Sequence, residues 1–201
     1  MNIRIVALAL LLAAQASLAQ EPPRPAKARA AQRAAMLATL ERGGPIQGSR
    51  GRYYHLPGVL AVSRASSAET LEQALARVGA GGAEVLETKG RLVLFRSPRR
   101  NAALVERVAG SSVYPTALNS RTGNLGVLTG TLVVQPRSMG DAAAIANSHG
   151  LDTAKEYPRI RFVFYRAKSG TDIAAAAAAL QADPRVETAY PEIVEYVRTP
   201  K

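Results

Sequence analysis

An internal repeat constrains the fold of this 201-residue chain more than any other feature of its sequence. The apolar run 91–96 (RLVLFR) is followed by a helical pattern and then by Val113-Tyr114-Pro115. The run 161–166 (RFVFYR) is likewise followed by a helical pattern and then by Ala189-Tyr190-Pro191. A strand–helix–strand pattern precedes each run, so the unit that occurs twice is β-α-β-β-α-β. We predict an α+β protein of two tandem ferredoxin-like (βαββαβ) units with antiparallel sheets.

Turn residues and composition divide the chain into four segments. Residues 119–126 (NSRTGNLG) are dense in turn formers, which places the first unit at 56–126 and the second at 127–201. Residues 20–55 form a basic leader rich in Ala and Pro, and we expect residues 20–52 of it to be disordered and dispensable for folding. We interpret residues 1–19 as a signal peptide, with Arg4 before an apolar run and a small-x-small cleavage site at its end.

The signal peptide predicts an exported protein, periplasmic or secreted, with no membrane contact after cleavage. No later segment is apolar for long enough to cross a bilayer. The chain has no cysteine, so packing alone must stabilise the exported fold.

Local signals predict the elements of the first unit. Apolar residues recur on one face of a helix that Ser66 or Ser67 would cap, at Leu71, Ala74, Leu75 and Val78. Lys89-Gly90 predicts a tight hairpin turn, and Asn101 would begin a second helix.

The second unit has comparable signals. One helix should end at His149-Gly150, and Thr171 should cap the next. Proline cannot donate to a strand ladder, so Pro191 places the last strand at an edge or gives it a break.

The strand at 161–166 is apolar on both faces, with Phe162 and Phe164 on one side and Val163 and Tyr165 on the other. An antiparallel sheet with one face in water should instead alternate apolar and polar residues. We therefore expect the face that helices do not cover to pack either against the other unit or against a partner protein.

The sequence contains no pattern typical of catalysis or cofactor binding. It has two histidines, no metal-ligand spacing, no Gly-x-Ser-x-Gly element and no glycine-rich phosphate loop after a strand. His149 lies at a predicted helix end, where it suits the helix dipole, and His55 has no carboxylate near it in sequence. The aromatic strand lacks the glycines of RNA-recognition motifs, so we expect no nucleic acid partner. We predict a binding protein without catalytic, cofactor or metal sites.

Three stretches of the second unit carry a more specific pattern. They are residues 129–134 (TGTLVV), 148–151 (SHGL) and 180–192 (LQADPRVETAYPE). Together they resemble the N-terminal propeptide of subtilisin-like serine proteases, in which "leucine, two residues, Asp-Pro-x-Val-x-x-Ala-x-Pro" ends the second helix and forms the last strand. The resemblance covers residues 127–201, and the first unit resembles the family only as a degenerate copy that keeps Val113-Tyr114-Pro115.

The resemblance implies a ferredoxin-like sheet that lies against the protease and a C-terminal tail that enters the active-site cleft like a product. It also implies action as an inhibitor and a folding chaperone. Because no protease domain follows Lys201, we expect a free-standing relative that acts on a subtilisin-like serine protease in trans. The expected partner-binding residues are Phe162, Val163, Phe164, Tyr165, Tyr190, Tyr196, Val197, Arg198, Thr199, Pro200 and Lys201. The alternative is an exported, non-inhibitory binding or scaffold module with no protease target.

Overall fold

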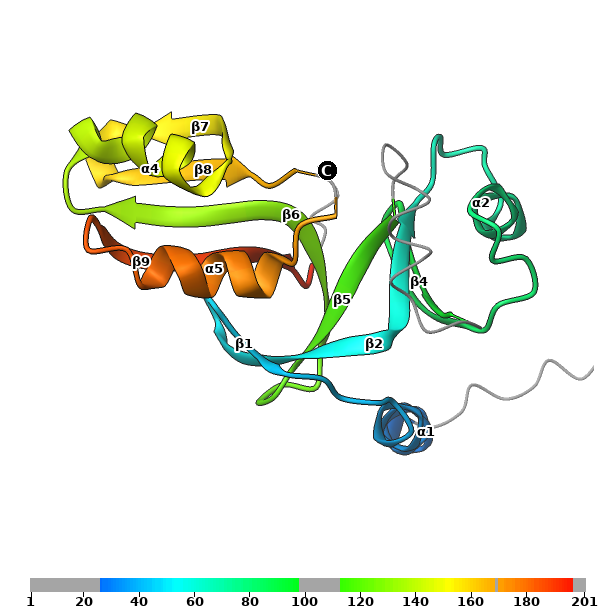
Figure 1. The fold of residues 1–201 in the computed structure, drawn as a ribbon. Helices are drawn as coiled ribbons and strands as arrows, with labels where there is room; N and C mark the ends of the chain where they lie inside the picture. Colours follow the sequence, from blue (N-terminus) through cyan, green and yellow to red (C-terminus); the bar gives the residue numbers. More distant parts are fainter. Residues whose placement is uncertain (1–25, 98–112, 169, 197–201) are drawn as a thin grey trace, which may run out of the picture. The chain divides into compact units, whose positions relative to one another are not determined.

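The structure, a computed structural model, describes residues 26–97, 113–168 and 170–196 (Figure 1). The chain divides into two compact units, Met1–Thr39 and Leu40–Lys201. Within Met1–Thr39 the described element is helix α1 (Ala26–Ala38). Near its end the Thr39 hydroxyl donates to the Met36 carbonyl at 2.8 Å. The predicted signal peptide lies outside the described residues. None of the described helices is long and apolar enough to cross a bilayer.

The compact unit Leu40–Lys201 is built on one nine-stranded sheet, in which the described strand pairs are antiparallel. Its strands are β1 (Pro45–Gly48), β2 (Gly51–Ser63), β3 (Val85–Lys89), β4 (Leu92–Arg96), β5 (Val113–Asn119), β6 (Leu125–Pro136), β7 (Asp152–Tyr157), β8 (Phe162–Arg166) and β9 (Val186–Val194). Its helices are α2 (Leu71–Arg77), α4 (Ala142–His149) and α5 (Ile173–Gln181), with short 3-10 turns at Met139–Asp141 and Pro158–Ile160. The predicted α+β class is confirmed.

The strand order is β3-β4-β2-β5-β6-β8-β7, with β1 added to β2 and β9 added to β6. We call β1 to β5 the first half and β6 to β9 the second half. Strand β6 joins the halves edge to edge, because β5 pairs with its start and β8 pairs with its end. The change of partner occurs at Gly130, which has a φ of +82° and lies within an irregularity of the β6–β9 pairing. Glycine adopts this left-handed conformation without the strain that a side chain would cause.

The two halves share a pairing pattern. Strand β2 has an irregularity just before Leu60, which lies opposite Pro115 of β5. Strand β6 has an irregularity just before Leu132, which lies opposite Pro191 of β9. The two Tyr-Pro pairs of the sequence repeat therefore occupy equivalent positions, where an interrupted ladder tolerates a residue without an N–H. Strand β9 pairs only with β6 among the described strands, in agreement with the edge position expected from Pro191.

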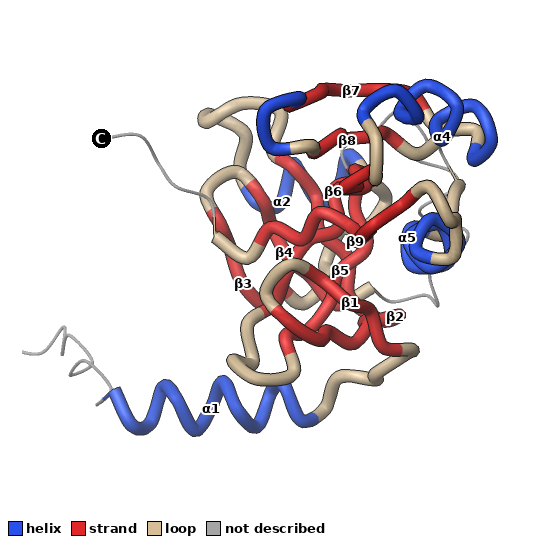
Figure 2. The backbone as a smooth tube through the Cα atoms, turned by 90° about the vertical axis from the view of Figure 1, so that its left-hand side faces the viewer, coloured by secondary structure: helices blue, strands red, loops and turns tan. Residues whose placement is uncertain are grey.

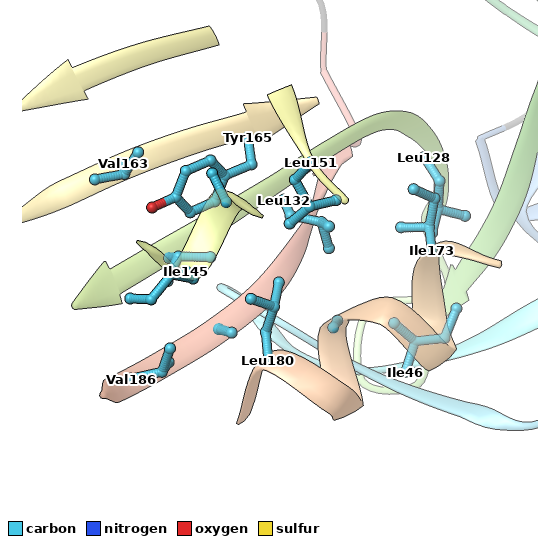
Figure 3. Close-up of a cluster of buried hydrophobic side chains, with 14 of the residues drawn as sticks. Ile46, Leu128, Leu132, Ile145, Leu151, Val163, Tyr165, Ile173, Leu180 and Val186 are labelled. Carbon is cyan, nitrogen blue, oxygen red and sulfur yellow. The ribbon is translucent and has the colours of Figure 1, made fainter. Parts of the chain in front are cut away.

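Each half has its own apolar cluster. In the first half, α2 packs on the side of the sheet that contains Val62, Val93 and Phe95. In the second half, Tyr165 and Leu132 pack with Ile145 of α4 and Leu180 of α5, as Figure 3 shows. Helices α4 and α5 lie on the same side of this sheet (Figure 2), so its other side is free of described helices.

The leader prediction is wrong from Leu40 onward. Leu40, Ile46 and Tyr53 are 6%, 4% and 1% exposed, and the last two belong to the cluster of the second half. Strands β1 and β2 also begin before Leu56, the predicted start of the first ferredoxin-like unit. β1 has four residues between glycines and turns, a run too short to show the alternation that identifies a strand.

Local helix signals were predicted more accurately than their caps. Ala74, Leu75 and Val78 are buried as the helical spacing predicts. Thr70, rather than Ser66 or Ser67, caps α2, in a reciprocal capping box with Gln73. Similarly, Asp172 rather than Thr171 caps α5. The helix expected after Asn101 lies outside the described residues.

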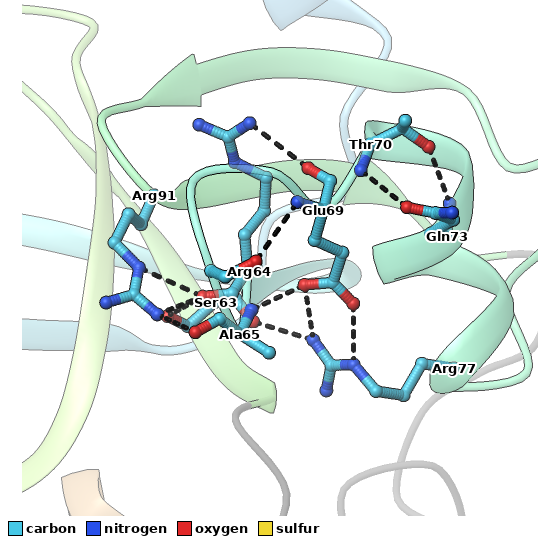
Figure 4. Close-up of polar contacts among 9 residues, drawn as sticks. Ser63, Arg64, Ala65, Glu69, Thr70, Gln73, Arg77 and Arg91 are labelled. Atoms are coloured by element: carbon cyan, nitrogen blue, oxygen red, sulfur yellow. Dashed lines mark hydrogen bonds and ion pairs between the residues drawn. The ribbon is translucent and has the colours of Figure 1, made fainter.

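Charged side chains hold the loop between β2 and α2, shown in Figure 4. Arg77 pairs with the Glu69 carboxylate at 2.9 Å, and its guanidinium also donates to the Ser63 carbonyl. Arg91 donates to the Arg64 carbonyl at 2.6 Å from the next hairpin. The turn of that hairpin is at Gly90, with a φ of +59°, as the sequence predicts.

We expect Ile46→Ala to lower the free energy of unfolding by about 2–5 kcal/mol, because it removes buried apolar volume from the core. The matched control is Ile160→Ala. Ile160 is 60% exposed, so this change should stay within about 0.5 kcal/mol of the unaltered protein. Urea unfolding followed by circular dichroism measures both. Equal stabilities of the two variants would mean that residues 40–55 are dispensable for folding.

Candidate functional site

The helix-free face of the second half is apolar at its centre. Val163 and Tyr165 of β8 are fully buried on the helix side, so Phe162 and Phe164 point to the other face, where they are half-buried. Phe164 lies opposite Val133 of β6, and Val133 lies opposite Tyr190 of β9. Directly paired residues share a face, so these three side chains form a row across three strands. We call Phe164, Val133 and Tyr190 the apolar row.

The hairpin of β7 and β8 extends the apolar row to the edge of the sheet. Tyr157 of β7 packs edge-on against Phe164, with ring centroids 5.4 Å apart, and remains 37% exposed. The Lys155 ammonium lies 4.9 Å from the centre of the Tyr157 ring. Ile160, in the turn of this hairpin, is 60% exposed. A contiguous, accessible apolar surface of this kind is typical of a protein interaction site.

The structure separates the predicted partner-binding residues into four groups, one of which is the buried pair Val163 and Tyr165. Phe162, Phe164 and Tyr190 lie on the helix-free face, and Tyr196 follows β9 with 61% exposure. Residues 197–201 lie outside the described residues.

The expectation is corrected for Val163 and Tyr165. Both are 0% exposed in the core, and the Tyr165 hydroxyl donates to the Ala142 carbonyl of α4 at 2.9 Å. Helix packing therefore removes them from the surface. Sequence analysis missed Val133 and Tyr157, because only the strand register places them beside Phe164.

His149 and Asp183 form a polar contact between the end of α4 and the residues after α5. His149 Nε2 lies 3.0 Å from Asp183 Oδ2, and the Arg185 guanidinium donates to the same oxygen at 2.6 Å. These hydrogen bonds, chiefly those from the Arg185 side chain, hold the pKa of Asp183 well below its usual range. The aspartate of the Asp-Pro motif therefore fixes the turn between α5 and β9, and His149 has a carboxylate partner that sequence spacing did not reveal.

A buried polar cluster surrounds Glu195, just after the end of β9. The Tyr53 hydroxyl donates to the Glu195 carboxylate, as do the side-chain amides of Asn119 at 2.8 Å and Asn124 at 3.2 Å. The Lys89 ammonium donates to the Glu195 backbone carbonyl at 2.7 Å. We call Tyr53, Lys89, Asn119, Asn124 and Glu195 the Glu195 cluster.

The protonation states in this cluster follow from burial and hydrogen bonding. Burial acts to raise the pKa of Glu195, but the hydrogen bonds from Tyr53, Asn119 and Asn124 outweigh it and lower the pKa below its usual value. Burial, reinforced by the contact with Glu195, raises the pKa of Tyr53 to about 12. The carboxylate is therefore charged and the phenol neutral at physiological pH.

A cavity of about 440 Å³ lies between β2 and the start of α5, with His55 and Asp172 among mainly apolar lining residues. Burial lowers the pKa of His55, and the charge of Asp172 partly opposes this shift. Within the described ranges, no group of three or more His, Asp or Glu residues could hold a metal ion.

The buried tyrosines predict a loss of stability at alkaline pH. Burial raises the pKa of both Tyr53 and Tyr165 to about 12, against about 10 in an unfolded chain. Between these values the folded protein binds more protons than the unfolded one, so the free energy of unfolding should fall as pH rises from about 10 to 12. The tyrosinate absorbance of the folded protein measures the pKa of its tyrosines. Tyr53→Phe and Tyr165→Phe should each remove one group that titrates late. Titration of every tyrosine near its ordinary pKa would contradict the predicted burial.

Comparisons with known proteins give one family and one solved structure. No curated protein matches the chain. A chain of the "Crystal structure of aeromonas sobria serine protease (ASP) and the chaperone (ORF2) complex" is 25% identical, over 43% of this chain and 83% of that chain, with a TM-score of 0.36. That TM-score is too low to establish a shared overall fold. The family model described as "Open reading frame 2 N-terminal domain" matches residues 100–200, just over half of the chain, and the protein therefore belongs to this family.

Proposed function

We propose that the protein binds a subtilisin-like serine protease in trans, as an inhibitor and a folding chaperone. The helix-free face of the second half would contact the protease surface, and residues 197–201 would enter the active-site cleft. The single observation that carries the proposal is the apolar row of Phe164, Val133 and Tyr190 on the helix-free face. The Asp-Pro-x-Val-x-x-Ala-x-Pro motif begins in the turn before β9, the last strand of this sheet, and continues into that strand.

We further propose that each half is a ferredoxin-like unit. The second half has the strand order β9-β6-β8-β7, with α4 after its first strand and α5 after its third. This order supports a ferredoxin-like unit with both helices on one face. In the first half the order β5-β2-β4-β3 is equivalent, and α2 follows β2, which corresponds to β6 of the second half. The position of its second helix would fall in residues 98–112, outside the described part of the chain.

The helix-free face has the composition of a protein interface. Aromatic residues are enriched in the energetically dominant part of interfaces, where they lose contact with water. Each large apolar side chain that becomes fully buried contributes about 1.5–3 kcal/mol. Phe162 and Phe164 are half-buried in the free protein, so only part of this amount remains available to each. The free energy of binding would therefore depend on several members of the face together.

The chain leads from this face towards the proposed tail. Tyr196 is exposed and directly precedes residues 197–201, which end in Pro200 and Lys201. A tail bound as an added strand forms main-chain hydrogen bonds, while alternate side chains enter specificity pockets. The same complex explains a chaperone role, because a protein that binds only the folded protease shifts the folding equilibrium towards that state.

Substitution of Phe164 tests the role of the apolar row. We expect Phe164→Ala to raise the dissociation constant for a subtilisin-like protease at least about tenfold, because it removes a half-buried aromatic side chain from the row. Leu71→Ala is the control, since Leu71 is also partly buried but packs at α2 in the first half. Calorimetric titration measures binding, and melting temperatures confirm that both variants fold. Equal binding by Phe164→Ala and the unaltered protein would exclude the helix-free face as the docking surface.

Deletion of the C-terminal residues tests the role of the tail. We expect deletion of residues 198–201 to leave the melting temperature unchanged, because a terminal segment makes few core contacts. The inhibition constant should rise at least about tenfold, which corresponds to about 1.4 kcal/mol. A shortened chain that binds without inhibiting would confirm separate roles for sheet and tail. Inhibition equal to that of the full chain would remove the tail from the mechanism.

A further inference from the structure

The Glu195 cluster contains most of the buried polar residues of the described chain. Buried polar or charged residues in the described ranges are Lys89, Thr116, Asn119 and Glu195, with exposures of 9%, 0%, 2% and 4%. Three of these four meet after the end of β9. Burial of a charge is unfavourable unless hydrogen bonds replace those lost to water, so such a cluster is retained only where its geometry is required.

The first half supplies the partners of Glu195. Strand β9 pairs with β6 as far as Val194, which lies opposite Val127. Beyond that point the hydrogen bonds to the Glu195 carboxylate come from the start of β2, the end of β5 and the turn before β6. Tyr53 and Asn119 lie directly opposite each other in the β2–β5 pair, so the sheet itself positions these two donors on one side of Glu195.

Lys89 holds the backbone at the same place. It is the last residue of β3, and its ammonium donates to the Glu195 carbonyl at 2.7 Å and pairs with Glu87 at 3.0 Å. The same ammonium lies 5.6 Å from the centre of the Tyr196 ring, within range of a cation–π contact. The side-chain amide of Asn124 contacts the Tyr196 hydroxyl. Backbone and side chains of the last two described residues are thus attached to the first half.

Close packing just before Glu195 reinforces this attachment. Ile193 lies over Gly126 of β6 and next to Gly48 of β1, and a Cβ at Gly126 would overlap the Ile193 side chain. Glycine at this position allows β9 to approach the start of β6. The path of the chain from Ile193 to Tyr196 is therefore fixed on both sides.

We propose that the first half is an anchor that fixes the direction in which the chain leaves β9, and that Tyr53, Lys89 and Asn119 are its positioning residues. The purpose of the anchor rests on the proposed function, because a fixed exit lowers the entropy that residues 197–201 lose when they bind a protease cleft. The anchor itself is a property of the free protein. This assigns a role to the first half, which has only a degenerate copy of the propeptide motif.

The anchor can be tested without a protease. Tyr53→Phe removes the hydroxyl that contacts Glu195, and Tyr165→Phe removes an equally buried hydroxyl that contacts the Ala142 carbonyl. We expect Tyr53→Phe to speed amide hydrogen exchange of residues 193–196 about tenfold while exchange in α4 and β8 is unchanged. Tyr165→Phe should leave residues 193–196 unchanged. Equal effects of the two variants on residues 193–196 would show a general loss of stability and would overturn the proposal.

A protease assay tests the purpose of the anchor separately. Lys89→Met keeps the apolar stem and removes the ammonium. We expect it to weaken inhibition by the full chain about tenfold, yet to leave the binding of a chain that ends at Tyr196 unchanged, because without residues 197–201 the exit direction has no effect on binding. The control is Lys168→Met, at an exposed lysine after β8.

The outcomes distinguish the two proposals. Equal weakening of the full and shortened chains by Lys89→Met would mean that the first half acts on the docking face, and it would overturn the anchor as a determinant of tail binding. Complete absence of protease binding by the unaltered protein would overturn the proposed function. In that case the exchange experiment would still decide whether Tyr53 fixes the end of β9.

Discussion

Strand β6 is the structural element on which the rest of the compact unit Leu40–Lys201 depends. Its start pairs with β5 of the first half, its end pairs with β8, and β9 follows its other edge. Gly130 permits the change of direction between these partners. One continuous strand therefore joins the two halves of the sheet edge to edge. It also places the end of β9 beside β2, β3 and β5, where the Glu195 cluster forms.

The two candidate surfaces differ in their physics. The apolar row keeps accessible aromatic surface at Phe164 and Tyr190, while Val133 between them is 6% exposed. This accessible surface would gain free energy when a partner covers it, as the proposed binding role requires. The Glu195 cluster is largely buried and its groups are hydrogen-bonded, which suits the proposed role of positioning the chain. A protein that uses both would combine a broad contact area with a segment held in a fixed direction. The first combines aromatic and β-branched side chains, and the second combines a carboxylate, two amides, a phenol and an ammonium.

Particular residues show how far sequence reasoning extends. The apolar composition of residues 161–166 indicated that both faces of β8 would be in contact with something. Which face holds Val163 and which holds Phe164 depended on where α4 and α5 pack, and both pairs are equally apolar in the sequence. Ile46 and Tyr53 were both assigned to the leader. Ile46 lies in β1, whose four residues show no clear period, and Tyr53 lies at the start of β2, within the same basic stretch. Glu195 was missed because its partners lie 71 to 142 residues away in sequence.

By itself, the sequence determined the class of the fold, the succession of strands and helices from β2 to β9 in the described ranges, and the equivalent places of the two Tyr-Pro pairs. These properties follow from local spacing, from turn residues and from the inability of proline to donate a hydrogen bond. Tertiary structure alone decided which aromatic side chains remain accessible, that the halves share one sheet through β6, and that the first half holds the end of β9. Those properties depend on strand register and on contacts between distant residues, which local patterns do not specify.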